Sequence, residues 1–394
     1  MANAIKILSM DGGNGINTAF LLQRLETASP HQNYLNQADI FAGTSAGGIN
    51  ALFFAAAEKP ADALSHIQQF WSEVNYSLLD GLKVKADEVV RDAVAGAQSN
   101  PLNPVASDHW QQLGSEIFRT LLGLGETVTG WRSLFLNDVL KKFLIKYFGE
   151  TTTLGSLKRG VITVTFELDN RKLGIDRSWV PRLFTNLPHT PAGAHGAMKK
   201  ATYPDADERI VDVAMRTSAA PLEMPIYQST RGGTEHSGYV DGGLVANNPA
   251  MVALTSVLGA LSGGTTQHSP QKPAQSLPQI HLLSVGTGRN LVGTAQFLDP
   301  DFVGGSAPWG YRQWLLDPTN PLVLIDAFLQ AGNEAVTWEC ETLMGEKHFH
   351  RLNVPLKHMC VIGDPETEVR VARAAEWLTN TDWFSEGPRG LEAI

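Results

Sequence analysis

The sequence predicts an α/β fold with a central, mainly parallel β-sheet covered by helices. Two units of strand, glycine-rich turn and helix follow one another within the first sixty residues. Two further apolar stretches of strand length, residues 161–166 and 280–285, are rich in β-branched or aliphatic side chains and end at turns or polar residues. Strands that alternate with helices in this way are typical of a parallel sheet.

The first unit begins with an apolar strand over residues 5–10, which runs into the glycine-rich segment 11–15. A helical pattern follows at Phe20, Leu21 and Leu25. The second unit has a short strand over residues 39–42, a tight turn over 43–47 and an apolar helix over 48–57. This second helix is too hydrophobic to expose any of its faces, so we expect it to be buried against the sheet.

A segment of different composition lies between residues 75 and 131. It contains charged stretches, a loop rich in Ser, Asn and Pro, and an amphipathic helix whose apolar stripe consists of Trp110, Leu113, Ile117 and Leu121. Two interpretations of this helix remain open, an insertion packed on the core and a lid or interfacial element. Residues 263–276 are polar and contain proline, so we expect a surface loop there.

The composition of the 394-residue chain excludes several classes of protein. A hydrophobic fraction of 43% with 18% charged residues supports a sizeable core and excludes disorder as the main state. The net charge of −9 offers no basic surface that would neutralise phosphates. Nucleic acid is therefore not expected as a partner.

The cysteine count and the lengths of the apolar runs indicate the cellular compartment of the protein. Cys340 and Cys360 are too few for a disulfide framework and fit a reducing environment. The longest apolar runs, such as residues 49–57, cover only about half of the roughly 20 residues needed to cross a bilayer. The N-terminal apolar stretch is interrupted by Lys6 and closed by Asp11. We expect a cytoplasmic protein that can act peripherally on a membrane surface, with export by a signal-less route left open.

Residues 43–47 have the sequence G-T-S-A-G, which matches the G-x-S-x-G nucleophile elbow. In that motif a sharp turn from strand to helix crowds the backbone so closely that only glycine fits on either side of the serine. A predicted strand precedes this segment and an apolar helix follows it. This context favours a catalytic Ser45, flanked by the elbow glycines Gly43 and Gly47, over a structural turn.

Two other glycine-rich segments carry candidate polar groups. Residues 11–15, D-G-G-N-G, lie between a strand and a helix, where consecutive backbone amides suit an anion or an oxyanion. A structural turn fits that segment equally well. Residues 239–243, Y-V-D-G-G, place Asp241 at the end of a short apolar stretch, and taken alone this pattern favours an Asx-type turn.

Together these three segments resemble the patatin-like phospholipase family. Their order and spacing fit throughout, as do T-S-A-A-P at 217–221 and L-S-V-G-T-G at 283–288. The resemblance covers about residues 5–290 and extends more weakly to about 355, where R-L-N at 351–353 is similar to the family. It implies a three-layer α/β/α fold with helical insertions. The catalytic domain would span residues 1–360, with the helical insertion at about 75–131, and a helical extension would span 361–394.

The resemblance also implies a lipid acyl hydrolase that uses a Ser-Asp dyad and needs no cofactor or metal. Carried onto this chain, Ser45 would be the nucleophile and Asp241 the base that accepts its proton. The other implied site residues are Gly12, Gly13 and Asn14, whose amides would form the oxyanion hole, and the supporting glycines Gly242 and Gly243.

The first motif departs from the family pattern D-G-G-G-x-R/K-G at three positions. Asn14 replaces the third glycine, Ile16 the basic residue and Asn17 the last glycine. The missing cation could have braced the loop or balanced substrate charge, so catalytic efficiency and a preference for anionic phospholipids are both open. A hole built from backbone amides survives side-chain changes, and Asn is well suited to an unusual φ.

An ordinary Ser-His-Asp hydrolase is the rival mechanism. His281, His348, His350 and His358 follow Asp241 in the chain order of that triad, but none has a recognisable loop signature. A metal site at His348 and His350 has neither a suitable helical context nor a nearby carboxylate motif.

The expected function is hydrolysis of acyl esters of glycerophospholipids or related lipids at a membrane surface, of the phospholipase A or lysophospholipase type. One alternative is a general carboxylesterase that acts on soluble or micellar esters. The other is a catalytically weak member that serves as a lipid-binding or signalling module. An unidentified activating ligand is left open.

Overall fold

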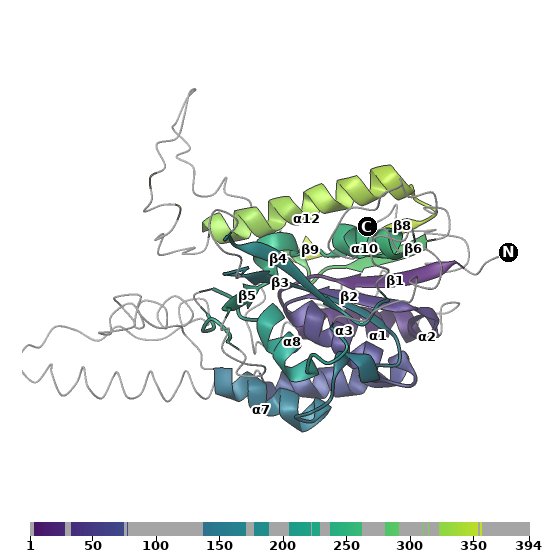
Figure 1. Cartoon of the computed structure of the whole chain (residues 1–394). Helices are drawn as coiled ribbons and strands as arrows, with labels where there is room; N and C mark the ends of the chain where they lie inside the picture. The colour runs from purple at the N-terminus through teal and green to yellow at the C-terminus, as the bar shows by residue number, and fades with distance from the viewer. Residues whose placement is uncertain are drawn as a thin grey trace, which may run out of the picture.

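The computed structural model describes residues 4–27, 33–74, 77, 137–170, 177–188, 205–221, 223–228, 237–261, 280–290, 310, 314, 323–353 and 355–356. Within these ranges a seven-stranded sheet lies between two layers of helices (Figure 1). The predicted α/β architecture with three layers is therefore confirmed. The predicted insertion at 75–131, apart from Ser77, and the predicted extension at 361–394 lie outside the described residues.

The main sheet has the strand order β4-β3-β2-β1-β6-β8, and β5 pairs with β3. The pairs β1–β2, β1–β6, β2–β3 and β6–β8 are parallel, whereas β4 and β5 run antiparallel to β3. The strands are β1 (Ile5–Met10), β2 (Ile40–Thr44), β3 (Gly160–Glu167), β4 (Val180–Thr185), β5 (Tyr239–Asp241), β6 (Ile280–Val285) and β8 (Phe349–Leu352). A second, two-stranded sheet contains β7 (Arg289–Asn290) and β9 (Pro355–Leu356).

The four strands predicted from the sequence all belong to the main sheet. β6 coincides with the predicted residues, and β3 is one residue longer at each end. The turn predicted over residues 43–47 is wrong in its extent, because β2 continues to Thr44 and α3 (Ala46–Ala56) begins at Ala46. Ser45 alone connects strand to helix, and its φ of 54° turns the chain within one residue.

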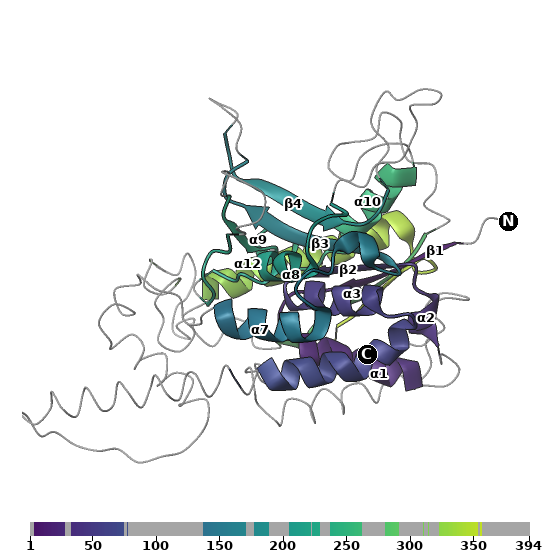
Figure 2. The same cartoon turned by 60° about the horizontal axis from the view of Figure 1, so that its bottom comes forward.

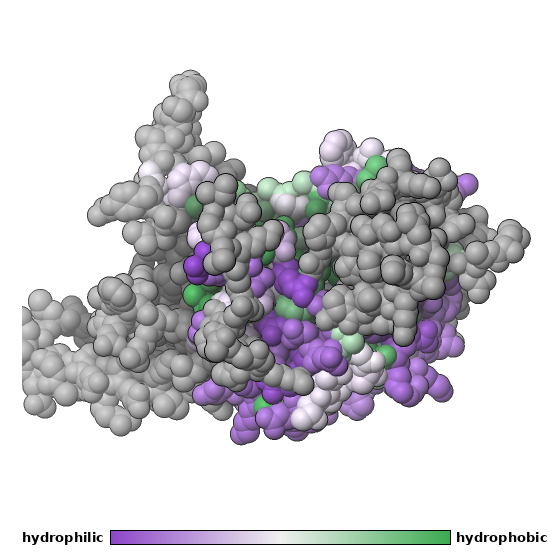
Figure 3. Space-filling view, in the orientation of Figure 1, coloured by the Kyte–Doolittle hydropathy of each residue, from purple (hydrophilic) through white to green (hydrophobic). Residues whose placement is uncertain are grey.

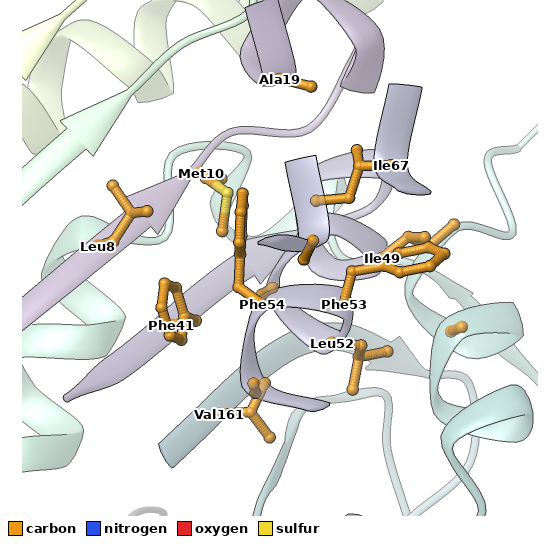
Figure 4. Close-up of a cluster of buried hydrophobic side chains, with 14 of the residues drawn as sticks. Leu8, Met10, Ala19, Phe41, Ile49, Leu52, Phe53, Phe54, Ile67 and Val161 are labelled. Carbon is orange, nitrogen blue, oxygen red and sulfur yellow. The ribbon is translucent and has the colours of Figure 1, made fainter. Parts of the chain in front are cut away.

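One layer of helices covers the face of the sheet on which α3 lies. Every residue of α3 from Ala46 to Ala55 is buried, as its composition predicts. Figure 4 shows Phe41 of β2 beside Phe54 of α3, and their stacked rings have centroids 5.3 Å apart. The other helices of this layer are α1 (Gly15–Thr27), residues 63–74, α7 (Asn137–Phe148) and α8 (Ile210–Thr217).

The opposite face is covered by α10 (Ala250–Leu261) and α12 (Val323–Met344), as Figures 1 and 2 show. Successive residues of a strand point to opposite faces, so Leu8 joins the core beneath α3 and Ile7 joins the core beneath α10. Both faces of the parallel strands are therefore buried. The short elements are α2 (Tyr34–Gln37), η1 (Pro60–Asp62), η3 (Leu154–Ser156) and α9 (Gly243–Ala246).

Among the helices that the structure describes, none is both long and apolar enough to span a membrane.

Candidate active site

Ser45 lies at the carboxyl end of β2, in the turn that leads into α3. Its φ of 54° and ψ of −124° place it in a region that non-glycine residues rarely adopt. The backbone N–H of Ser45 donates to Oγ1 of Thr217 over 2.9 Å. The strained turn presents Ser45, which is partly exposed, at the edge where the parallel strands end.

The two glycines beside Ser45 are required by close contacts within the backbone. A Cβ atom on Gly43 would lie 2.1 Å from the carbonyl oxygen of Gly47. A Cβ atom on Gly47 would lie 2.3 Å from the carbonyl oxygen of Met10 and 2.4 Å from that of Asp11. The elbow is therefore packed directly against the end of β1 and the start of the glycine-rich loop.

Asp241 reaches Ser45 because β5 and β2 pair with successive parts of β3. Thr44 of β2 pairs with Val164 of β3, and Asp241 of β5 pairs with the next residue, Thr165. The sheet therefore places the end of β5 beside the end of β2. In this arrangement the Ser45 hydroxyl is close enough to the Asp241 carboxylate to lower its pKa.

The Asp241 carboxyl is only 6% exposed. Burial raises its pKa to about 7, and the nearby Glu223 carboxyl contributes to the rise. The Ser45 hydroxyl and the N–H of Gly243, which donates to Oδ1 over 2.6 Å, oppose the rise. A carboxyl with this pKa is a base that accepts and returns a proton near neutral pH.

Gly242 and Gly243 allow β5 to end in a tight turn. A Cβ atom on Gly242 would lie 2.1 Å from the carbonyl oxygen of Val164. A side chain at position 242 would therefore collide with the backbone of β3. With glycine there, the chain turns so that the N–H of Gly243 donates to the Asp241 carboxylate.

The glycine-rich loop from Asp11 to Asn14 lies beside the elbow. A Cβ atom on Gly12 would be 3.2 Å from the Cβ of Ser45. The N–H of Gly12 donates to the carbonyl oxygen of Asn247 over 3.0 Å, so this amide is already engaged. The amides of Gly13 and Asn14 have no hydrogen-bond partner among the described residues. Two of the three amides named from the sequence are therefore available to an anion.

Two residues of the loop have distinct conformations. Gly13 has a φ of 124°, which L side chains rarely adopt. Asn14 has no positive φ, and its Oδ1 accepts the N–H of Asn17 over 3.4 Å. Asn14 thus acts as an N-cap for α1, which explains why this helix begins at Gly15 rather than near Phe20.

Thr217 is a site residue whose role was not recognised in the sequence. Its Oγ1 accepts the N–H of Ser45 and donates to the carbonyl oxygen of Val164 over 2.5 Å. Its own carbonyl accepts the N–H of Gly242 over 3.2 Å. One residue at the end of α8 therefore holds both the serine turn and the turn after Asp241. The T-S-A-A-P segment was the only sequence signal for it.

The histidines weighed for a triad do not approach Ser45 where the structure describes them. His281 pairs with Lys6 at the start of β1, whereas Ser45 follows the end of the parallel strand β2. His348 stacks near His281, with ring centroids 4.8 Å apart. β1 and β6 separate the strand of His350 from β2, which corresponds to roughly 14 Å at about 4.8 Å per strand. His358 lies outside the described residues.

Across the described ranges, no group of three or more His, Cys, Asp or Glu side chains is arranged to hold a metal ion.

Comparison with known proteins yields one family and several relatives. The model of the family described as patatin-like phospholipase matches residues 8–254. Patatin-like protein 2 of Arabidopsis thaliana is 25% identical over 376 residues, which cover 92% of this chain and 77% of that protein. The cGAMP-activated phospholipase of Vibrio cholerae is 25% identical over 328 residues, with coverage of 80% and 73%.

A search of solved structures gives a more distant match. VipD from Legionella pneumophila matches with a TM-score of 0.38 and 13% identity. The match covers 95% of this chain and 65% of VipD, so this chain spans slightly less than two thirds of that protein.

Proposed function

Because the chain belongs to the patatin-like phospholipase family, we propose that it cleaves acyl esters of glycerophospholipids, with Ser45 as nucleophile and Asp241 as the base. Membership of the family supports hydrolysis of lipids. The observation that supports the dyad is the placement, by the pairing of β2 and β5 with β3, of a buried carboxyl with a pKa of about 7 beside the strained Ser45.

Acylation begins when the ionised Asp241 accepts the hydroxyl proton of Ser45. The serine oxygen attacks the ester carbonyl, and negative charge develops on the carbonyl oxygen. We assign the amides of Gly13 and Asn14 to the stabilisation of this charge, since they follow Gly12, which lies against Ser45, and have no partner among the described residues. Each such donor typically contributes about 3 to 4 kcal/mol in the transition state.

The tetrahedral intermediate then collapses. Asp241, now protonated, gives its proton to the oxygen of the leaving lysolipid or glycerophosphodiester, and an acyl-serine remains. A water molecule then takes the place of the leaving group, gives a proton to Asp241 and attacks the acyl group. The second collapse releases the fatty acid and restores the Ser45 hydroxyl. A carboxyl with a pKa near neutrality can perform both transfers because neither of its protonation states is strongly favoured.

We further propose that the protein acts peripherally at a membrane surface. Leu244 of α9, three residues after Asp241, is 54% exposed, and Phe328 of α12 is 71% exposed. The side chain of Leu329 lies beside Gly243, so α12 and α9 are in contact next to the site. On the face drawn in Figure 3 the described surface is largely hydrophilic, with hydrophobic atoms along its upper edge, where α12 lies in Figure 1.

The proposal is tested with a fluorophosphonate probe and a lipid panel. Wild-type protein should be labelled by the probe and should release fatty acid from phospholipids, as read by mass spectrometry. Ser45→Ala should lose both properties. Ser65→Ala is the matched control, because Ser65 lies on an exposed helix face in residues 63–74 and should be dispensable.

Three outcomes separate the alternatives. Turnover of a short soluble ester without release of fatty acid from any phospholipid would indicate a general carboxylesterase. Labelling that persists in Ser45→Ala would exclude Ser45 as the nucleophile. Absence of labelling in wild-type protein that still binds lipid vesicles would indicate a binding module.

A further inference from the structure

We propose that Arg351, which follows the family-matched region by almost a hundred residues, is a positioning residue for the glycine-rich loop and sets its amides in place for catalysis. This inference rests on the proposed function. It concerns a residue that forms no hydrogen bond or ion pair with Ser45 or Asp241 in the described part of the chain, and that acts through Asp11.

The contact between Arg351 and Asp11 is bidentate. Nη1 of Arg351 donates to Oδ1 of Asp11 over 2.7 Å, and Nη2 donates to Oδ2. Both side chains are buried, at 9% and 2% exposure respectively. Two parallel bonds between a guanidinium and a carboxylate fix orientation as well as distance, which a single ammonium group cannot do.

Asp11 transmits this constraint to the site because it is the first residue of the loop. Its N–H donates to the carbonyl oxygen of Val285 over 3.0 Å, so its backbone is tied to the end of β6. Its own carbonyl oxygen packs against Gly47 of the elbow. The next residue, Gly12, lies against Ser45. A movement of the Asp11 side chain would therefore shift the peptides that carry the Gly13 and Asn14 amides.

Arg351 is itself held by buried polar groups. Its Nη1 also donates to Oγ of Ser284 over 2.8 Å, and Ser284 donates to Oδ1 of Asn248 over 3.1 Å. Nδ2 of Asn248 donates to the carbonyl oxygen of Asn333 on α12 over 3.4 Å. The network thus joins β8, β6, α12 and the loop.

The segment from Asp11 to Asn17 contains no basic residue. At position 16, where the family pattern has a basic residue, this chain has a buried isoleucine. Arg351 supplies a cation to this segment from a distant strand. Without it, Asp11 would be a buried carboxylate that lacks its ionic partner, and such groups take up a proton or move toward solvent. Either change releases the first residue of the loop.

The experiment compares Arg351→Lys and Arg351→Gln with wild-type protein. With a short soluble ester, kcat should fall by about 100-fold in Arg351→Lys and further in Arg351→Gln, as expected for catalytic groups displaced by about 1 Å. KM should change little, because the oxyanion forms only in the transition state. The matched control is Arg209→Lys, which alters another Arg–Asp pair: Nε of the partly buried Arg209, the residue before α8, lies 2.6 Å from Oδ2 of the buried Asp212 in the first turn of α8.

A purely structural role would give a different result. Arg351→Lys and Arg209→Lys would then lower the melting temperature and kcat together and to similar extents. If Arg351 positions the loop, the double variant Gly13→Ala with Arg351→Lys should be only slightly slower than Gly13→Ala, since groups that act as a unit are non-additive. Additive losses, or an unchanged kcat in folded Arg351→Lys, would overturn the proposal.

A second variant covers the case in which Arg351 variants do not fold. Asp11→Asn keeps an acceptor oxygen for the guanidinium, and it should lower kcat more than KM while the melting temperature stays close to that of Arg209→Lys. Full activity in Asp11→Asn would refute the role of the pair. If wild-type protein showed no Ser45-dependent turnover, the proposed function itself would fail, whereas active wild-type protein with fully active Arg351 and Asp11 variants would overturn this inference alone.

Discussion

Replacing Asp241 by asparagine should remove turnover and, at neutral and higher pH, stabilise the fold. Asn keeps the size of the side chain and an acceptor oxygen for Ser45 and Gly243, but it cannot accept a proton. The proposed base is then absent, so kcat should fall by orders of magnitude. The stabilisation arises because the wild-type protein must hold an ionised carboxylate in a buried position.

The size of the effect follows from the pKa of Asp241. Its rise from 3.8 to about 7 corresponds to about 4 kcal/mol against the carboxylate, at about 1.4 kcal/mol per pH unit. The folded pKa lies above the unfolded one, so folded protein binds the proton more tightly between these two values. Wild-type stability therefore falls relative to Asp241→Asn as the pH rises from about 4 to about 7, and the difference is constant above that range.

The assay is urea unfolding of both proteins at several pH values. The stability of Asp241→Asn relative to wild type should increase by about 2 to 3 kcal/mol between about pH 5 and about pH 8. In parallel, kcat/KM of the wild-type enzyme with a soluble ester should rise with pH and level off above an apparent pKa of about 7, because only ionised Asp241 is a base.

The test depends on how the stability difference between Asp241→Asn and wild type changes with pH. New contacts of the introduced asparagine side chain would change the size of that difference by the same amount at every pH. A difference that is flat from pH 5 to 8 would show that Asp241 does not titrate near neutrality. A pH–rate profile that levels off below about pH 5 would contradict the same reasoning.

Three further predictions concern the loop, the histidines and the surface. Gly13→Ala should lower kcat by about 100-fold, because the φ of Gly13 is 124° and the new Cβ would lie 2.8 Å from Oγ1 of Thr287. The control is Gly345→Ala, which also has a positive φ, of 68°, but lies in open space and should retain full kcat. Burial lowers the pKa of His350 to about 3 and also lowers that of His281. The folded protein therefore binds a proton at His350 less readily than the unfolded chain, so thermal melts should show the stability of wild type relative to His350→Gln falling as the pH drops below about 6.5, at unchanged kcat. A rate as low as that of a serine knockout in folded His350→Gln would instead favour the triad. Leu244→Asp should reduce hydrolysis of phospholipid vesicles several-fold while sparing a soluble ester, and an equal loss of both rates would contradict the membrane-facing assignment.

The central strands could be predicted because each is a run of apolar residues buried on both faces. β1, β2, β3 and β6 are such runs, and helix α3 is apolar on every side. β4 was missed because its sequence, VPRLFT, includes a proline and an arginine that an edge strand tolerates. β8 has only four residues, and two of them are polar. Short edge strands form through pairing with their neighbours, which a local pattern does not contain.

The candidate site likewise has parts that the sequence predicted and parts that it did not. Ser45 and its flanking glycines form a local motif, and the spacing of the three glycine-rich segments carried the family resemblance. The engaged amide of Gly12 and the double contact of Thr217 depend on residues far away in the chain. The pKa of Asp241 depends on burial. The catalytic roles of Ser45 and Asp241 stay predictions.

The bond between Arg351 and Asp11 joins residues 340 positions apart. At about 5 to 20 residues per second, a ribosome needs roughly 15 to 60 seconds after adding Ser45 before it adds Arg351. During that interval the growing chain has its serine, and later its aspartate, but not the arginine that ties down the first residue of the loop. On the proposed role of Arg351, the glycine-rich loop of the nascent chain is held in place only once synthesis has passed β8.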